Sequence, residues 1–167
     1  MKSNFDGPLD IRYDRRASDV LGGNYFRVLK SFRYYLPASF IGNEWTAYQS
    51  NRWVFVPSGM LTDLASIPAI FRGFLDTTGP YMQAAVVHDQ LCEYLSITQD
   101  GQPKSITRPE ADLILRAAML DLNVPKIQVN LIYDAVAAYT EFFDIRDPST
   151  TAIKRRLESD WNFEGLN

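Results

Sequence analysis

The sequence predicts an α+β fold in which a small N-terminal antiparallel sheet packs on three or four C-terminal helices. Aromatic and β-branched residues are concentrated in short runs of the first half, for example residues 25–35. In the second half, apolar residues recur three and four positions apart over segments of helical length, starting near residue 80. The chain has 167 residues, of which 46% are hydrophobic, and this favours one domain spanning residues 1–167.

The composition argues against several classes of protein. The formal net charge of −3 argues against general nucleic-acid binding. No run of about 18 apolar residues exists, so we expect no transmembrane segment. The chain has one cysteine and therefore no internal disulfide, and residues 1–16 lack the apolar core of a secretory signal.

The first quarter of the chain is predicted to hold one loop and one strand. Residues 1–23 are expected to form an N-terminal arm without regular structure, because Gly7-Pro8 and Gly22-Gly23 interrupt them. Tyr25–Tyr35 is rich in aromatic residues and predicts a single strand, which Pro37 ends.

Residues 24–75 are expected to contain the strands and one irregular loop. Glu44–Tyr48 and Arg52–Val56 predict a hairpin in which Trp45 faces Trp53. The loop that follows, VPSGMLTDLASIP, is apolar enough to require burial, so polar side chains must satisfy its backbone groups. The side chains suited to this are those of Thr62, Asp63 and Ser66. A short helix is expected over Ala69–Leu75.

Residues 79–143 are expected to form the helical part of the domain. In Pro80–Leu95 the apolar residues form one stripe that includes His88, and Asp89 lies about 100° round the helix from it. Residues 97–105 are polar and predict a surface loop. Thr107–Glu110 is a capping box that opens a second helix, and Pro125 opens a third that ends near Phe143.

Residues 148–167 are expected to form a last helix and a tail. Thr151–Trp161 predicts a basic amphipathic helix. The tail carries the apolar residues Phe163 and Leu166, and we expect both chain termini to dock on a partner molecule.

Polar residues next to apolar stretches are the candidates for a functional site. They are Asp63, Ser66, His88, Asp89, Arg108 and Asp112. Two interpretations remain open. His88 and Asp112 either form a buried polar lock between helices or belong to an active site in which His88 moves a proton.

The active-site interpretation has several chemical variants. Ser66, His88 and Asp112 would form a nucleophilic triad, although no nucleophile-elbow pattern surrounds the serine. Cys92 follows His88 by one helical turn, so a Cys–His dyad is a further variant. Asp63 and Asp89 would suit a hard divalent cation such as calcium.

Three motifs in order resemble a known family. VPSGMLTDLASIP, AAVVHDQLC and TRPEAD are similar to V-P-x-G-F-x-T-D-x-A-S-V-P, H-D-x-L-Y and R-x-x-A-D, which mark a domain-of-unknown-function family of tailed phages and prophages. Met60 stands where the family usually has Phe, and Cys92 where it usually has Tyr. The resemblance implies a phage or prophage origin. We therefore expect a virion-associated protein of the tail or of capsid assembly, with other virion proteins as partners. It would be found in the virion, or in the host cytoplasm before assembly.

A second resemblance concerns the arrangement of the polar residues alone. A His-Asp pair on one helix with an Asp from a second helix is similar to phospholipase A2. That resemblance implies His88 as general base, Asp89 as calcium ligand and Asp112 as the residue that orients His88. Asp63, Ser66 and Arg108 would support the substrate or the loop. The glycine-rich calcium loop is missing, so Asp63 would have to supply a metal contact. The alternative function is thus a phage hydrolase that acts on lipid or peptidoglycan of the host envelope.

Overall fold

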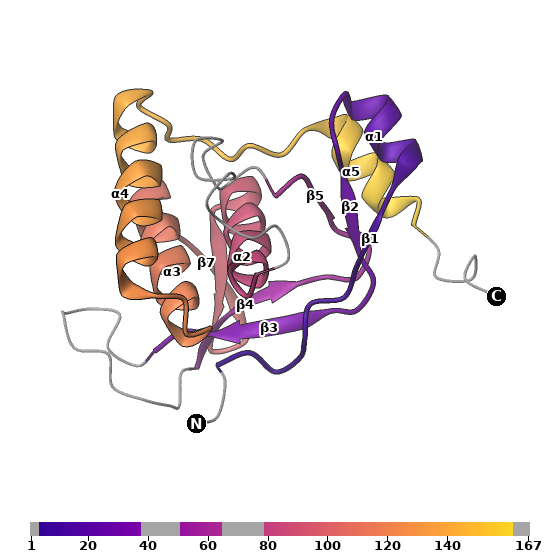
Figure 1. The fold of residues 1–167 in the computed structure, drawn as a ribbon. Coiled ribbons are helices and arrows are strands. Elements are labelled where there is room, and N and C mark those ends of the chain that lie inside the picture. The colour runs from indigo at the N-terminus through magenta and orange to yellow at the C-terminus, as the bar shows by residue number, and fades with distance from the viewer. Residues whose placement is uncertain (1–3, 38–50, 65–78, 162–167) are drawn as a thin grey trace.

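The structure, a computed structural model, describes residues 4–37, 51–64 and 79–161 (Figure 1). Within them, two small antiparallel sheets and five helices form an α+β fold, which confirms the predicted class. The elements in chain order are β1 (Ile11–Tyr13), α1 (Arg15–Leu21), β2 (Phe26–Val28), β3 (Phe32–Tyr35), β4 (Arg52–Val56), β5 (Leu61–Thr62), α2 (Tyr81–Tyr94), β6 (Ser96–Gln99), β7 (Gln102–Ser105), α3 (Arg108–Asp121), α4 (Lys126–Phe142) and α5 (Ala152–Ser159).

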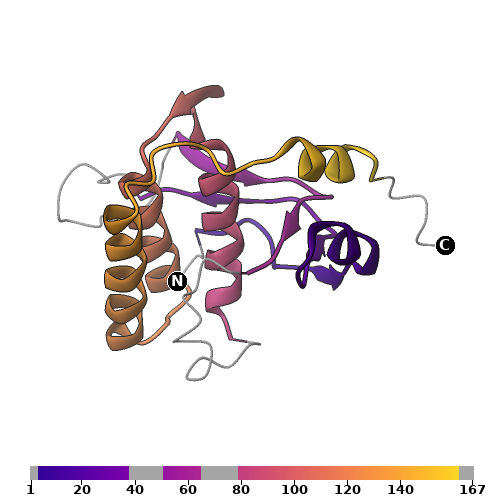
Figure 2. The same cartoon turned by 90° about the horizontal axis from the view of Figure 1, so that it is seen from above.

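The central helix α2 organises the molecule. In both views it lies between α3 and α4 on one side and α1, β1, β2 and α5 on the other (Figures 1 and 2). Its small residues, Ala84 and Ala85, allow close packing and are fully buried, as are Val86 and Val87. The helix is therefore buried on almost every side, and its predicted stripe is only part of its buried surface.

The first sheet corrects two sequence predictions. It has the order β1-β2-β5, and its first strand and α1 lie within residues 1–23, which were expected to be irregular. The Asp14 side chain caps α1 by accepting a hydrogen bond from the Ala17 amide at 2.8 Å, and Gly22 ends the helix with a φ of 77°. Tyr25–Tyr35 is not one strand, because the chain leaves the first sheet after Val28 and enters the second at Phe32.

The second sheet has the order β3-β4-β6-β7 and corrects a third prediction. Residues 97–105, expected as a surface loop, contribute a hairpin, β6 and β7. Asp100 and Gly101 make its two-residue turn with φ angles of 52° and 75°, as a type I′ turn requires. Arg52–Val56 is a strand as predicted. Its expected partner, Glu44–Tyr48, lies outside the described residues, as do Trp45 and Ala69–Leu75.

The helices end close to their predicted bounds. Thr107 and Glu110 form the expected capping box at the start of α3, and Asn123 follows that helix with a left-handed φ of 58°. In α4 only Val129, Ile132, Val136 and Thr140 are buried. None of the described helices is both long enough and apolar enough to span a membrane.

The described parts of both chain ends make contacts with this chain itself, and the expectation that the termini dock on a partner stays a prediction. Phe5 is buried and bridges to Tyr34 of β3. The segment before α5 crosses the C-terminal end of α2, where the Ser149 amide donates to the Cys92 carbonyl at 2.9 Å. The Leu61 amide in turn donates to Glu158 of α5 at 2.8 Å. The tail residues Phe163 and Leu166 lie outside the described part of the chain.

Candidate functional site

His88 and Asp112 form the predicted contact between two helices. His88 Nε2 lies 2.8 Å from Asp112 Oδ1, and each side chain is only 1% exposed. Both positions are on apolar faces of neighbouring helices, so packing α2 against α3 brings the pair together. The second oxygen, Asp112 Oδ2, has no hydrogen-bond partner among the described residues.

Electrostatics keep this pair charged. Burial of the ring lowers the pKa of His88, but the charge of the Cys92 sulfur and the hydrogen bond that the ring donates to Asp112 outweigh it and raise the pKa from 6.5 to about 10. The imidazole is therefore protonated at neutral pH, and its Nε2–H donates to the Asp112 carboxylate. In this state His88 stabilises the helix packing and is not available as a base.

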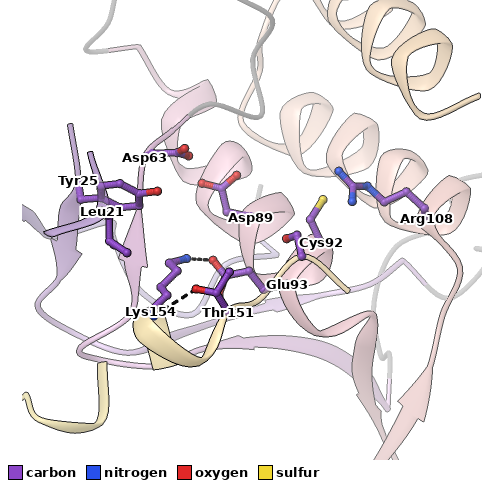
Figure 3. A pocket seen from close by; sticks show the side chains of 10 residues that line it. Leu21, Tyr25, Asp63, Asp89, Cys92, Glu93, Arg108, Thr151 and Lys154 are labelled. Atoms are coloured by element: carbon purple, nitrogen blue, oxygen red, sulfur yellow. Dashed lines mark hydrogen bonds and ion pairs between the residues drawn. The ribbon is translucent and has the colours of Figure 1, made fainter. Parts of the chain in front are cut away.

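Cys92 separates His88 from a neighbouring pocket. Its Sγ lies 3.5 Å from His88 Nε2 and 3.7 Å from Nδ1. Cys92 lines the pocket, whereas His88 and Asp112 do not. Figure 3 shows this pocket between α2, α3, α5 and the first sheet. It has a volume of about 450 Å³, and its lining residues are Leu21, Tyr25, Asp63, Asp89, Cys92, Glu93, Arg108, Ser149, Thr151 and Lys154.

Asp63 and Asp89 meet at one end of the pocket, with their carboxylates facing one another (Figure 3). Asp89 is buried and accepts a hydrogen bond from the Thr62 hydroxyl, whereas Asp63 is exposed. Burial raises the pKa of Tyr25, and the charges of Asp63 and Asp89 raise it further. The two carboxylates therefore create a locally negative end of the pocket.

Lys154 of α5 supplies the positive charge that balances this end. It pairs with Glu93 and lies 3.8 Å from Glu158. Burial lowers the pKa of Lys154, while the charges of Glu158, Asp89 and Asp63 oppose that change. The described residues contain no group of three or more His, Cys, Asp or Glu side chains that would hold a metal ion. Two carboxylates with a lysine beside them do not fit calcium, so we assign no chemistry to a metal here.

Arg108 forms the other end of the pocket. Its side chain extends from the start of α3 toward Cys92 (Figure 3). Its Nε is buried and has no hydrogen-bond partner in the described parts of the chain. The structure thus places Arg108 with Asp63 and Asp89 around one pocket and Asp112 behind it. Ser66 lies outside the described residues.

Three titratable residues of the pocket, Tyr25, Glu93 and Lys154, were not predicted from the sequence. Tyr25 immediately precedes β2, Lys154 comes from α5, and Glu93 shares α2 with the predicted residues. Neither Tyr25 nor Lys154 stands near a motif in the sequence. A signal was available for Glu93, which lies one turn after Asp89 on the same helix face.

Comparison with known proteins gives a family and no activity. The pair of packed helices with a buried His–Asp contact lies within residues 42–136, which match the model of a family described as a protein of unknown function, DUF1353. The match covers more than half of the chain, so the chain belongs to this family. Searches of curated proteins and of solved structures found no match.

Proposed function

We propose that the chain is a phage-encoded protein that is built into the virion or helps to assemble its tail or capsid. The observation that carries this proposal is an exposed apolar face on α4. Ile127, Leu131, Tyr139 and Phe142 lie on it, and Phe142 is 82% exposed. Their spacing puts them on one side of the helix, opposite the buried residues Val129, Ile132, Val136 and Thr140. Apolar surface of this kind marks a site where another protein binds.

The position of α4 fits a docking role. The helix lies at the outer edge of the molecule in both views (Figures 1 and 2). It packs on α3, which the His88–Asp112 contact joins to α2. The motifs that resemble the tailed-phage family support the choice of a neighbouring virion protein as the partner. The protein would then occur in the virion, or in the host cytoplasm before assembly.

The test uses phage particles that carry variants of the chain. Replacing both Leu131→Asp and Phe142→Asp should reduce the amount of protein in purified particles by about tenfold or more, since charges would enter an apolar contact. Val20→Asp on α1 is the matched control, because Val20 is also an exposed apolar residue. Circular dichroism should show that both variants are folded. Equal incorporation of the α4 variant and the control would overturn the proposal.

A second candidate function is a hydrolase that acts on lipid or peptidoglycan of the host envelope. The pocket beside the His88–Asp112 pair favours it, because a substrate has room there next to Asp63, Asp89 and Arg108. The burial of His88 and its pKa of about 10 disfavour it, because a general base must be neutral and must reach its water. His88→Gln separates the two functions. A folded variant that enters particles but fails to support phage growth would favour the hydrolase.

A further inference from the structure

Glu93 of α2 is a buried carboxylate that faces the pocket and keeps one oxygen without a partner. The residue is 5% exposed, and its Oε2 has no hydrogen-bond partner among the described residues. Its Oε1 pairs with the Lys154 ammonium, and Figure 3 shows the two side chains reaching toward one another from α2 and α5. A carboxylate removed from water needs a cation beside it, because desolvation otherwise favours its neutral form. Glu93 therefore marks a position at which a cation is required.

Two further carboxylates of the pocket surround the same ammonium. Asp89 lies one helical turn before Glu93, and Asp63 follows β5. Their charges act on the Lys154 ammonium, as does that of Glu158. An ammonium is a compact charge with three N–H donors, so several carboxylates can share it. The pocket has a volume of about 450 Å³, which leaves room for an alkyl chain beside the charge. The site thus has the chemistry to hold a primary alkylammonium group.

The cation that fills this site belongs to a segment with little packing of its own. Residues 149–161 form the α5 segment, and none of the residues of α5 is buried. A hydrogen bond from the Leu61 amide to Glu158 helps to hold the segment, and Trp161 lies half-buried below the Arg27 guanidinium. An element with few buried apolar contacts opens at a lower free energy than the whole domain. We therefore expect the α5 segment to leave α2 while the other helices stay folded.

We propose that the carboxylates of Asp63, Asp89 and Glu93 form a binding site for a primary alkylammonium group. Lys154 is the internal ligand of this site, and it leaves the site when the α5 segment opens. Because the internal ligand is a lysine side chain, the external ligand that matches it best is a lysine side chain of a second protein. The exchange replaces one set of ion pairs by another. The proposal does not depend on a role in the virion, since it uses the pocket and not the exposed face of α4.

The first experiment tests whether the α5 segment opens by itself. Hydrogen exchange of the full-length wild type is followed by mass spectrometry, and peptides from α5 are compared with peptides from α2. Amides of α5 should exchange about tenfold faster or more, because exchange in the buried helix α2 requires the whole domain to open. Equal protection of the two helices would mean that Lys154 never leaves the site in the folded protein, and the proposal would fail.

The second experiment adds n-propylammonium chloride, whose cation has the same heavy atoms as the lysine side chain beyond Cβ. Tetramethylammonium chloride at the same concentration is the salt control, since it carries the same charge and has no N–H donor. In the wild type, the site is accessible to the probe only when the α5 segment is open. The probe should therefore raise the exchange rate of α5 by about threefold or more over the salt control, because it increases the population of the open form.

Lys154→Ala should reverse the sign of this effect. The variant lacks the internal ammonium, so its α5 segment should exchange about tenfold faster than that of the wild type. The probe can then fill the site while the segment is closed, and it should slow exchange by about threefold or more. Arg156→Ala is the matched control, because it removes an exposed cation of the same helix and should respond to the probe as the wild type does. Adding Glu93→Gln to Lys154→Ala should abolish the response.

The sign of the response separates a binding site from a general effect of salt, which would act in one direction in every variant. Equal effects of the probe and the salt control on the wild type, or the same sign in the wild type and Lys154→Ala, would refute the site. If Lys154→Ala does not fold, Glu93→Gln alone decides, and a probe effect that persists in it overturns the assignment. A lysine with both backbone ends blocked should act like n-propylammonium. A response to the free amine alone would overturn the protein partner.

Discussion

Replacing His88 removes the only described hydrogen-bond partner of a carboxylate that is 1% exposed to solvent. His88→Ala leaves the Asp112 carboxylate buried among apolar side chains of α2 and α3. Removing one partner of a buried ion pair costs about 3–5 kcal/mol in the free energy of unfolding. His88→Gln keeps one neutral N–H donor for the carboxylate. Its cost should therefore be about 1–3 kcal/mol, typical of a weakened buried hydrogen bond.

The effect of His88 on stability should depend on pH in a defined direction. The pKa of His88 is raised from 6.5 to about 10 on folding. A raised pKa means that the stabilisation is complete below pH 6.5 and is lost as the pH rises toward 10. The free energy of unfolding of the wild type should fall across this window by no more than about 1.4 kcal/mol per pH unit. His88→Gln lacks the titrating group, so the difference between the two proteins should shrink with rising pH.

Urea unfolding followed by circular dichroism at several pH values between 6 and 10 measures the free energy of unfolding of each variant and its dependence on pH. Asp134→Asn is the matched control, since Asp134 is an exposed carboxylate on α4 and its loss should change stability by less than about 0.5 kcal/mol. A cost below about 1 kcal/mol for His88→Ala at pH 6 would refute the buried-pair argument. A difference between wild type and His88→Gln that is constant across the window would refute the raised pKa.

Three further predictions follow from the packing of the N-terminal sheet and the helix caps, and urea unfolding measures each of them. Gly59→Ala should lower the free energy of unfolding by about 2–3 kcal/mol, because φ is +92° and a Cβ would lie 2.7 Å from the Trp161 side chain. Gly101→Ala is the control and should lower it by only about 1 kcal/mol, because φ is +75° but the space around the residue is open. Thr107→Ala removes the side-chain cap of α3 and should cost about 1 kcal/mol. Arg27→Met should cost about 2–3 kcal/mol and hasten proteolysis near α5, since Arg27 donates to Asp14 at 2.7 Å and to the Leu157 carbonyl at 3.2 Å.

The helices could be predicted because their signals are local. The capping box at Thr107 and the apolar spacing after Pro80 depend only on residues within a few turns of one another. The start of α3 and the extent of α2 agree with these signals. The same local rules placed His88 and Asp112 on apolar faces, and two such faces on consecutive helices pack together. That is why their contact could be expected before the structure was known.

The missed strands owe their conformation to pairing with distant residues. All four residues of β7 are exposed, and Pro103 lies within that strand, so neither burial nor propensity marks it. It is an edge strand, held by backbone hydrogen bonds to β6. The Asp100-Gly101 pair was a usable hairpin signal that the polar flanking residues obscured. In residues 25–35, the switch between sheets after Val28 reflects tertiary pairing that no local pattern encodes.

Some residues that line the pocket lie inside the segment that matches the family model, and others lie outside it. His88, Cys92, Arg108 and Asp112 lie in the matched residues 42–136, whereas Tyr25 and Lys154 lie outside them. The helix contact thus belongs to the part of the chain that the family model describes. The counter-charge for Asp63, Asp89 and Glu93 comes from α5, which the match does not include. Variants of His88 therefore examine the helix contact inside the matched segment, and variants of Lys154 examine the part of the pocket that lies outside it.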